Sequence, residues 1–423
     1  MIVLSGAALV LPDRILSPGT LIIDDGRIAE IRPDAPAANH PHSLFAFHGH
    51  YIVPGFIDVH VHGVDGVDSL DEGDAIGSIA TRLPQYGVTA FCPTTVACAP
   101  DALRRVLDQI RRARETPPPR GARVLPAHLE SNFISPEYNG AQPADCLRIP
   151  REALVGSGLS TEARVEATAQ AKVDGSGLRE EFSGADILAE IERAAPDVGI
   201  VTIASELDGG VDLVRWLTAR GHRVSLGHSG ASYDEACEAI AAGARHATHL
   251  FNRMPPLGHR NPGLAGAILQ TEEIAAEIIC DGVHVHPAMV RAAIAAKRPA
   301  HIMAITDATA VAGLQRGARA ALGGRPIIAG DATAVLDDGT IAGSMLTMDR
   351  AFRTLAGKFG VSLVDAVTMC ATTPARELGL VGHGVLARDA WADLVILDEQ
   401  LTVIQTYIAG QLVYARSAES SNV

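Results

Sequence analysis

The central part of the chain alternates short apolar runs with longer stretches of helical periodicity. "GVTAFCPTT" (87–95) is followed by the amphipathic "APDALRRVLDQIRRARE" (99–115), and "HRVSLGHS" (222–229) by "SYDEACEAIAAGA" (232–244). Further apolar runs are "ARHATHL", "EIICDGVHV" and "HIMAITDA". Strand, helix and strand in repetition predict a parallel sheet with crossover helices. The segment 54–375 is long for a doubly wound sheet and suits a TIM-like (β/α)8 barrel with insertions.

The two chain ends have a different pattern, in which β-branched runs are separated by turns. "LIIDDGRIAEI" (21–31) predicts two strands joined at Asp25-Gly26, and "ADLVILDEQLTVIQTYIAGQLVYA" (392–415) predicts strands separated at "DEQ" and "AGQ". We therefore expect an α/β fold in which residues 1–53 and 376–423 build one small β-sandwich domain beside the barrel. Residues 150–184 have weak periodicity, which we interpret as an inserted helical hairpin or a mobile loop.

Composition narrows the class of protein. The 423 residues are 47% hydrophobic and 20% charged, and the net charge of -14 comes without any basic run that could neutralise a phosphate backbone. A nucleic-acid partner is therefore not expected, whereas an anionic small molecule remains compatible, because a pocket can hold local positive groups. Six scattered cysteines without a C-x-x-C pair indicate reduced thiols, and no apolar stretch is long enough to span a bilayer. We expect a cytoplasmic location and no contact with a membrane.

Candidate chemistry lies where apolar runs end, because the active site of a barrel gathers at the carboxyl ends of its strands. His60 and His62 are two residues apart on one predicted strand, so both rings project from the same side. An isolated H-x-H is more often a surface or packing feature than a pair of metal ligands. Here, however, other potential ligands end apolar runs in the same predicted barrel. The other polar residues that end apolar runs are Glu130, His228, His249, His284 and Asp307. Imidazoles with carboxylates favour Zn²⁺ or Fe²⁺ over Mg²⁺ or Ca²⁺.

A series of short motifs along the chain resembles a known family. In order, they are "PGFIDVHVHG", "HLE", "GHS", "THLFNRMP", "HRNPGLAG", "DGVHV", "ITDA", "IAGSMLTM" and "ADLVILD". Together they resemble the amidohydrolase superfamily and, within it, the N-acetylglucosamine-6-phosphate deacetylase family. The first motif alone indicates only the superfamily, whereas the middle motifs are specific to the family, and the resemblance covers nearly the whole chain.

The resemblance implies a divalent metal centre with one or two ions per subunit, either Zn²⁺ or Fe²⁺. Glu130 of "HLE" takes the place of the carbamylated lysine that bridges the metals in most binuclear members of the superfamily. His228 and His249 complete one metal site with Glu130. His60 and His62 hold a second ion with Glu130, and Asp307 is a further candidate ligand.

The resemblance also implies a reaction, in which the N-acetyl amide of N-acetylglucosamine 6-phosphate is hydrolysed to glucosamine 6-phosphate and acetate in amino-sugar catabolism. Asp307 is the implied catalytic acid and base, and Gln142 of the "YNGAQ" loop is a candidate donor to the oxyanion. The implied substrate contacts are Arg260 and His284 for the phosphate, with Asn252 and the backbone of Arg253 beside them. A homodimer is implied, with the neighbouring subunit closing the phosphate pocket.

Three departures from the family pattern bear on the substrate. The family usually has "HLEGPF" and "NAMP" where this chain has "HLESNF" and "NRMP", and Ser205 replaces a proline before a glutamate. Alternatives therefore stay open: the galactosamine epimer or an unphosphorylated N-acyl amino sugar and, more distantly, a cyclic-amide hydrolase or nucleobase deaminase. A non-catalytic relative that acts as a scaffold is the alternative from another class, although such proteins tend to lose ligands that this chain retains.

Overall fold

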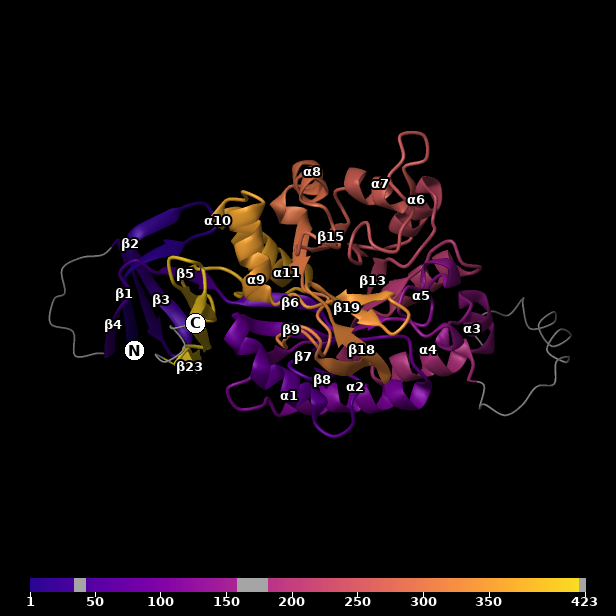
Figure 1. Ribbon diagram of the computed structural model, residues 1–423, viewed down its shortest axis with the longest axis horizontal. Coiled ribbons are helices and arrows are strands. Elements are labelled where there is room, and N and C mark those ends of the chain that lie inside the picture. The colour runs from indigo at the N-terminus through magenta and orange to yellow at the C-terminus, as the bar shows by residue number, and fades with distance from the viewer. Residues whose placement is uncertain (34–42, 158–181, 418–423) are drawn as a thin grey trace, which may run out of the picture.

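The computed structural model describes residues 1–33, 43–157 and 182–417, and its centre is a parallel barrel (Figure 1). Neighbouring strands pair in parallel in the order β6-β9-β11-β12-β13-β14-β15-β16. Their bounds are β6 Phe56–Val61, β9 Val88–Thr95, β11 Ala127–Glu130, β12 Val198–Ile203, β13 Arg223–Leu226, β14 His246–Ala247, β15 Ala275–Ile279 and β16 Ile302–Ile305. The short β10 (Arg123–Val124) also pairs with β9. The predicted TIM-like barrel is confirmed.

The barrel closes between its last and first strands. The backbone N–H of Asp307 donates to the carbonyl of His60 at 3.0 Å, and that of His62 donates to Ala308 at 2.8 Å. These bonds lie at the carboxyl end of β6, so the closure itself brings the histidine pair beside Asp307.

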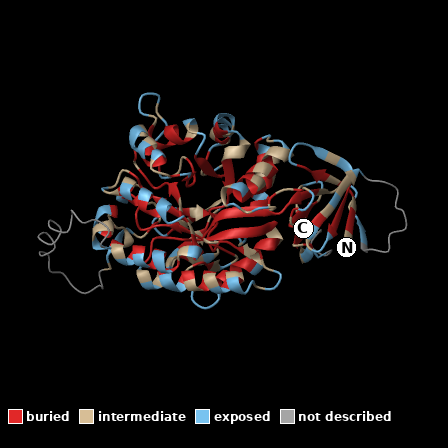
Figure 2. Ribbon diagram, turned by 180° about the vertical axis from the view of Figure 1, so that it is seen from behind, coloured by how far each residue is buried: buried red, intermediate tan, exposed pale blue. Residues whose placement is uncertain are grey.

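Helices cover the outside of the barrel. Their bounds are α1 Ala75–Arg82, α2 Pro100–Glu115, α3 Pro150–Gly156, α4 Gly184–Arg193, α5 Gly210–Ala219, α6 Tyr233–Ala241, α7 Gly263–Gln270, α8 Pro287–Lys297, α9 Met348–Arg353, α10 Leu363–Val367 and α11 Thr373–Glu377. The predicted helix α2 buries Leu103, Val106, Leu107 and Ile110 at helical spacing and leaves its arginines outside. Figure 2 shows the result, with buried strands inside and exposed faces on the helices.

The strands of both chain ends pair in one sheet, so the two ends come together as predicted, although the expected form was a β-sandwich. Its order is β23-β22-β21-β5-β1-β2-β3, and β4 pairs with β1. The bounds are β1 Ile2–Val10, β2 Ile15–Asp24, β3 Arg27–Pro33, β4 Ser43–Ala46, β5 Tyr51–Pro54, β21 Leu394–Leu397, β22 Val403–Ile408 and β23 Gln411–Ala415. At the predicted hairpin, Asp24 pairs with Arg27, and Asp25 and Gly26 have φ values of 45° and 74°. Positive φ at both central residues is typical of a type I′ turn.

A small antiparallel sheet after β16 has no counterpart in the sequence prediction. It contains β17 Arg319–Leu322, β18 Arg325–Ala329, β19 Thr333–Leu336 and β20 Ile341–Ser344. Its core, with Ile327 and Ala342 at the centre, packs on Val96 and Val311 beside the barrel. The N–H of Ser344 donates to the carbonyl of Asp307 at 2.8 Å, which fixes the sheet to the end of β16.

Part of the segment 150–184 lies outside the described residues. Helix α3 begins at Pro150 and α4 begins after Ser183, so the predicted helical hairpin or loop falls mostly on residues 158–181, which the structure does not describe. A further short pair, β7 Gly63–Val64 and β8 Val67–Asp68, follows β6. Within the described ranges, no helix combines the length and apolarity needed to cross a membrane.

Candidate metal centre and substrate pocket

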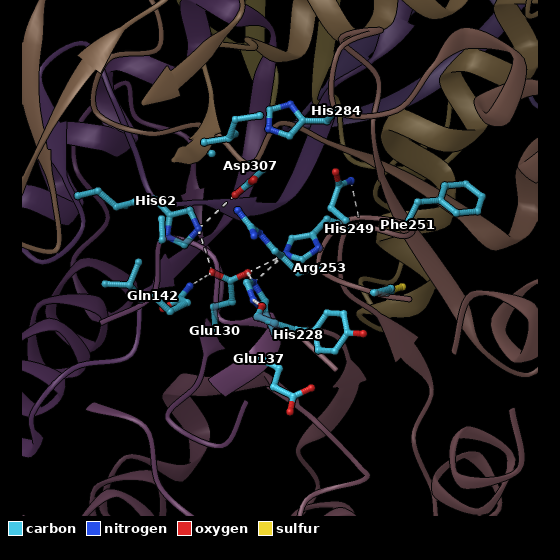
Figure 3. Close-up of a pocket in the computed structure, with 18 residues that line it drawn as sticks. His62, Glu130, Glu137, Gln142, His228, His249, Phe251, Arg253, His284 and Asp307 are labelled. Carbon is cyan, nitrogen blue, oxygen red and sulfur yellow. Dashed lines mark hydrogen bonds and ion pairs between the residues drawn. The ribbon is translucent and has the colours of Figure 1, made fainter. Parts of the chain in front are cut away.

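The six predicted ligand side chains converge at the carboxyl ends of the barrel strands. Figure 3 shows five of them, all except His60. They form two buried groups, and within each group the ligand atoms lie within 4.8 Å of one another. One group contains Glu130, His228 and His249, and the other contains His60, His62 and Asp307. The geometry therefore gathers the residues that the strand-end pattern selected.

Glu130 lies between the two groups. Its Oε1 atom is 2.8 Å from Nε2 of both His228 and His249, and its Oε2 atom is 3.6 Å from Nε2 of His62. One carboxylate thus faces both clusters, which is the arrangement required of a bridging ligand.

The ring nitrogens of the histidines face the carboxylates and one another. Nδ1 of His228 donates to the carbonyl of Tyr138 at 2.8 Å, and its Nε2 lies 2.8 Å from Oε1 of Glu130. Nδ1 of His60 lies 2.9 Å from Oε2 of Glu277, and its Nε2 faces Nε2 of His62 at 3.2 Å. Imidazole nitrogens and carboxylate oxygens gathered at these distances are a donor set that fits Zn²⁺ or Fe²⁺.

Both carboxylates of the cluster are held in the ionised form. Burial acts to raise the pKa of Glu130, but the attraction of His228 and hydrogen bonds from His228 and His249 lower that pKa well below its usual value. Burial likewise opposes ionisation of Asp307, and the hydrogen bond from His62 with the attraction of His60 and His62 lowers its pKa. Ionised carboxylates are suited to bind a cation and to accept a proton.

Three of these side chains sit on unusual backbone. His228, His249 and Asp307 have φ values of 47°, 28° and 49°, in the left-handed region that L-residues rarely adopt. Each of the three lies two residues after the end of a barrel strand. The chain therefore kinks where the side chain must point toward the barrel axis. Such strain is common at functional sites, where surrounding contacts hold it.

A second layer of buried polar residues beneath the cluster was missed by the sequence analysis. Glu277 in the middle of β15 is fully buried, and its Oε1 lies 3.7 Å from Nδ1 of His128. His128 in turn contacts the carbonyl of Val59 and the hydroxyl of Thr202, both at 2.9 Å. A carboxylate within the apolar run "AAEIIC" was a signal in the sequence, because charged residues are almost never fully buried without a partner.

The cluster forms the floor of a cavity of about 450 Å³, which is in the size range of small-molecule sites. The loop after β11 forms one wall, the segment after β14 forms another, and the small antiparallel sheet contributes a third. The wall residues are Glu137, Tyr138, Ala141, Gln142, Phe251, Asn252, Arg253, Met254, Leu322, Ile341 and Gly343, with Val96 and His284 beside them.

Gln142 is held directly beside the cluster. Its Nε2 donates to Oε2 of Glu130, and its Oε1 accepts from the N–H of Ala97 at 2.7 Å. The amide orientation is therefore fixed, and one amide hydrogen remains for a ligand in the cavity.

Of the five predicted substrate contacts, four line the cavity, Gln142 among them, and one does not. His284, Asn252 and Arg253 are lining residues, whereas Arg260 is exposed and is not among them. Nδ1 of His284 is 2.6 Å from Oδ2 of Asp281, which leaves its buried Nε2 without a partner among the described residues. The expectation that Arg260 reaches the site is therefore not met within one chain.

Comparison with known proteins places similar sequences in the family that the motifs resemble. Residues 218–413 match the model of the Amidohydrolase family. The N-acetylglucosamine-6-phosphate deacetylase of Bos taurus is 36% identical over 97% of this chain and 94% of its own. The N-acetylgalactosamine-6-phosphate deacetylase of Escherichia coli O157:H7 is 32% identical over 93% of this chain and 94% of its own.

A solved structure agrees over the same length. It is a variant of the Mycobacterium smegmatis N-acetyl-D-glucosamine-6-phosphate deacetylase, with an aspartate replaced by alanine, in complex with N-acetyl-D-glucosamine 6-phosphate. It is 29% identical, covers 98% of this chain and 99% of its own, and superposes with a TM-score of 0.83.

Proposed function

This chain belongs to the N-acetylglucosamine-6-phosphate deacetylase family of amidohydrolases, and from that premise we propose that it hydrolyses N-acetylglucosamine 6-phosphate to glucosamine 6-phosphate and acetate. The observation that carries the proposal is the pair of buried His and carboxylate clusters at the floor of a sugar-sized cavity. All six cysteines are free, which supports a reducing, cytoplasmic location.

The proposed metal ligands are the residues of the two clusters. Glu130 with His228 and His249 would hold one ion, and His60 with His62 and Asp307 would hold a second. A divalent ion bound there would polarise the amide carbonyl and lower the pKa of water toward about 7. We propose Zn²⁺ or Fe²⁺ on the chemistry of the nitrogen and oxygen donors.

Asp307 is the proposed catalytic acid and base. Its carboxylate lines the cavity, and its backbone is fixed by hydrogen bonds to His60 and Ser344. The carboxylate accepts a proton from water as the water oxygen bonds to the acetyl carbon. The same proton then passes to the amide nitrogen as the C–N bond breaks, which releases acetic acid and the amine. The acid ionises to acetate, and its proton goes to the amine or to solvent.

Gln142 is proposed to stabilise the developing oxyanion. Its orientation is set by Ala97 and Glu130 before substrate arrives, so no reorganisation is needed as charge develops. The remaining amide hydrogen points from the cavity wall beside the cluster, where the acetyl oxygen must lie for attack.

Phosphate recognition is assigned to His284, Asn252 and the backbone of Arg253. The free Nε2 of His284 is the atom left for a phosphate oxygen, and the N–H of Arg253 makes no hydrogen bond within the described residues. We also propose that Arg260 acts in a homodimer, at the phosphate pocket of a second subunit, because it is exposed and does not line the cavity of its own chain.

The proposal is tested by measuring acetate release from metal-replete protein with N-acetylglucosamine 6-phosphate, its galactosamine epimer and unphosphorylated N-acetylglucosamine. We expect rapid release from the first compound and loss of activity with a chelator, restored by Zn²⁺ or Fe²⁺. The relative from Escherichia coli O157:H7 makes the galactosamine epimer the second candidate, and preferential release from that compound would establish it instead. No release from any of them, in protein that holds metal, would overturn the function.

A further inference from the structure

We propose that the guanidinium of Arg253 binds the substrate phosphate within its own subunit and sets the preference for phosphorylated sugars. The inference rests on the proposed function and adds to it a side chain that the family pattern does not supply. Where this chain reads "NRMP" the resembled pattern reads "NAMP", so the guanidinium is a departure from that pattern.

The backbone that carries Arg253 forms an anion-binding concavity. His249, Phe251 and Arg253 have φ values of 28°, 76° and 53°, whereas Leu250 and Asn252 between them have negative φ. Alternation of this kind turns successive N–H groups toward one side, as in the nests that bind phosphate. The N–H groups of Phe251, Arg253 and Met254 donate no hydrogen bond within the described residues, so they remain for a ligand.

The side chain of Arg253 crosses to the opposite wall of the cavity. A Cβ atom on Gly140 would lie 2.6 Å from its Nε atom and 3.1 Å from Cζ, so the guanidinium packs over the bare backbone of that glycine. Gly140 itself has φ +62°, a conformation that glycine adopts without strain. The loop after β11 therefore leaves the space that this guanidinium occupies, and Figure 3 shows Arg253 among the side chains that converge on the cavity.

The charge of Arg253 is unneutralised. It makes no ion pair or side-chain hydrogen bond within the described residues, and it is the only arginine or lysine among the described residues that line the cavity. The other charged wall residue is Glu137, and Glu130 and Asp307 add negative charge at the floor. Positive charge in the cavity wall attracts a phosphorylated substrate, and a guanidinium can bind two phosphate oxygens at once.

The test compares Arg253→Ala and Arg253→Lys with wild type on phosphorylated and unphosphorylated N-acetylglucosamine. We expect Arg253→Ala to raise KM for the phosphorylated compound, with a small change in kcat, and to reduce the preference in kcat/KM by about 10- to 100-fold. The lysine variant should recover part of the preference, because it keeps the charge and loses the bidentate geometry. Arg105→Ala, on the exposed face of α2, is the matched control.

A second measurement keeps this inference separate from the proposed activity. Inorganic phosphate should bind metal-replete wild-type protein in calorimetry, and Arg253→Ala should weaken that binding by about tenfold or more, whether or not acetate is released. An unchanged phosphate affinity, or an equal loss of kcat/KM on both sugars, would overturn the role of Arg253 and leave the deacetylase activity standing. Absence of acetate release together with the weakened phosphate binding would overturn the function alone.

Discussion

Asp307 has a carboxylate that faces both the metal cluster and the cavity. Its Oδ1 atom is 3.3 Å from Nε2 of His62 and 3.4 Å from Nε2 of His60, so it is a candidate ligand as well as the candidate acid and base. The two roles differ in what removal of the charge would do. Loss of a ligand lowers metal content, whereas loss of a proton acceptor lowers the rate in protein that still holds metal.

Asp307→Asn keeps the size of the side chain and removes the proton acceptor. We expect kcat to fall by about 10² to 10⁴, the usual contribution of general acid and base catalysis, while the ion at Glu130, His228 and His249 is retained. Acetate release and metal analysis on the same samples measure both. Asp331→Asn, on an exposed turn of the small antiparallel sheet, is the control. A fall in metal content in proportion to activity would mean that Asp307 acts chiefly as a ligand.

At the scale of elements, one barrel strand carries two candidate ligands and another strand supports them from beneath. Strand β6 presents His60 and His62 at its end, and β15 places Glu277 beneath them, 2.9 Å from Nδ1 of His60. A carboxylate on the outer nitrogen of a ligating imidazole fixes the tautomer and the ring orientation. Glu277 therefore acts on the site through His60, as a positioning residue, without touching the cavity.

Glu277→Gln tests the support given by β15. We expect a 10- to 100-fold loss of metal affinity, because the amide no longer accepts the His60 proton with the strength of a carboxylate. The readout is the chelator concentration that removes half of the metal, with Glu273→Gln, exposed just before β15, as control. Unchanged metal affinity, in protein that unfolds at the wild-type temperature, would contradict the assignment.

At the scale of the whole molecule, one buried carboxylate joins the barrel to the terminal sheet. Asp393, directly before β21, accepts hydrogen bonds from Nδ1 of His383 at 2.8 Å and from the N–H of Ala409 at 2.7 Å. The guanidinium of Arg123, on β10 of the barrel side, lies 3.2 Å from the same carboxylate. Burial acts to raise the pKa of Asp393, but the hydrogen bond from His383 and the attraction of Arg123 lower it below the usual 3.8.

Asp393→Asn should destabilise the fold by about 2 kcal/mol at neutral pH, because buried donors lose a charged acceptor. The pKa in the folded state is below the unfolded value, so this contribution is fully present above about pH 4 and is lost as pH falls further. Urea unfolding of both proteins at pH 7 and at pH 3.5 measures the difference, which should be smaller at pH 3.5. A difference that grows on acidification would contradict the assignment.

The sequence alone determined the barrel, the pairing of the two chain ends and the six side chains that gather in the two clusters, because these follow from local patterns. Strand periodicity and the I′ turn at Asp25-Gly26 are properties of short segments. The polar residues that end apolar runs had to meet, since parallel strands of a barrel end at one face. Short motifs then indicated which of them form a metal centre.

Only the tertiary structure decided the contacts between residues that are far apart in the chain. The Nε2 atoms of His60 and His228 are directed inward because Nδ1 of each ring contacts Glu277 or the carbonyl of Tyr138, and neither partner is near its histidine in the chain. Gly140 and Arg253 are likewise distant in the chain and come into contact only in the folded protein. Arg260 lies outside the cavity, although its motif suggested a contact with the substrate. The pattern along a strand fixes which way a side chain faces, but its partner across the barrel is set by the closure of the whole sheet.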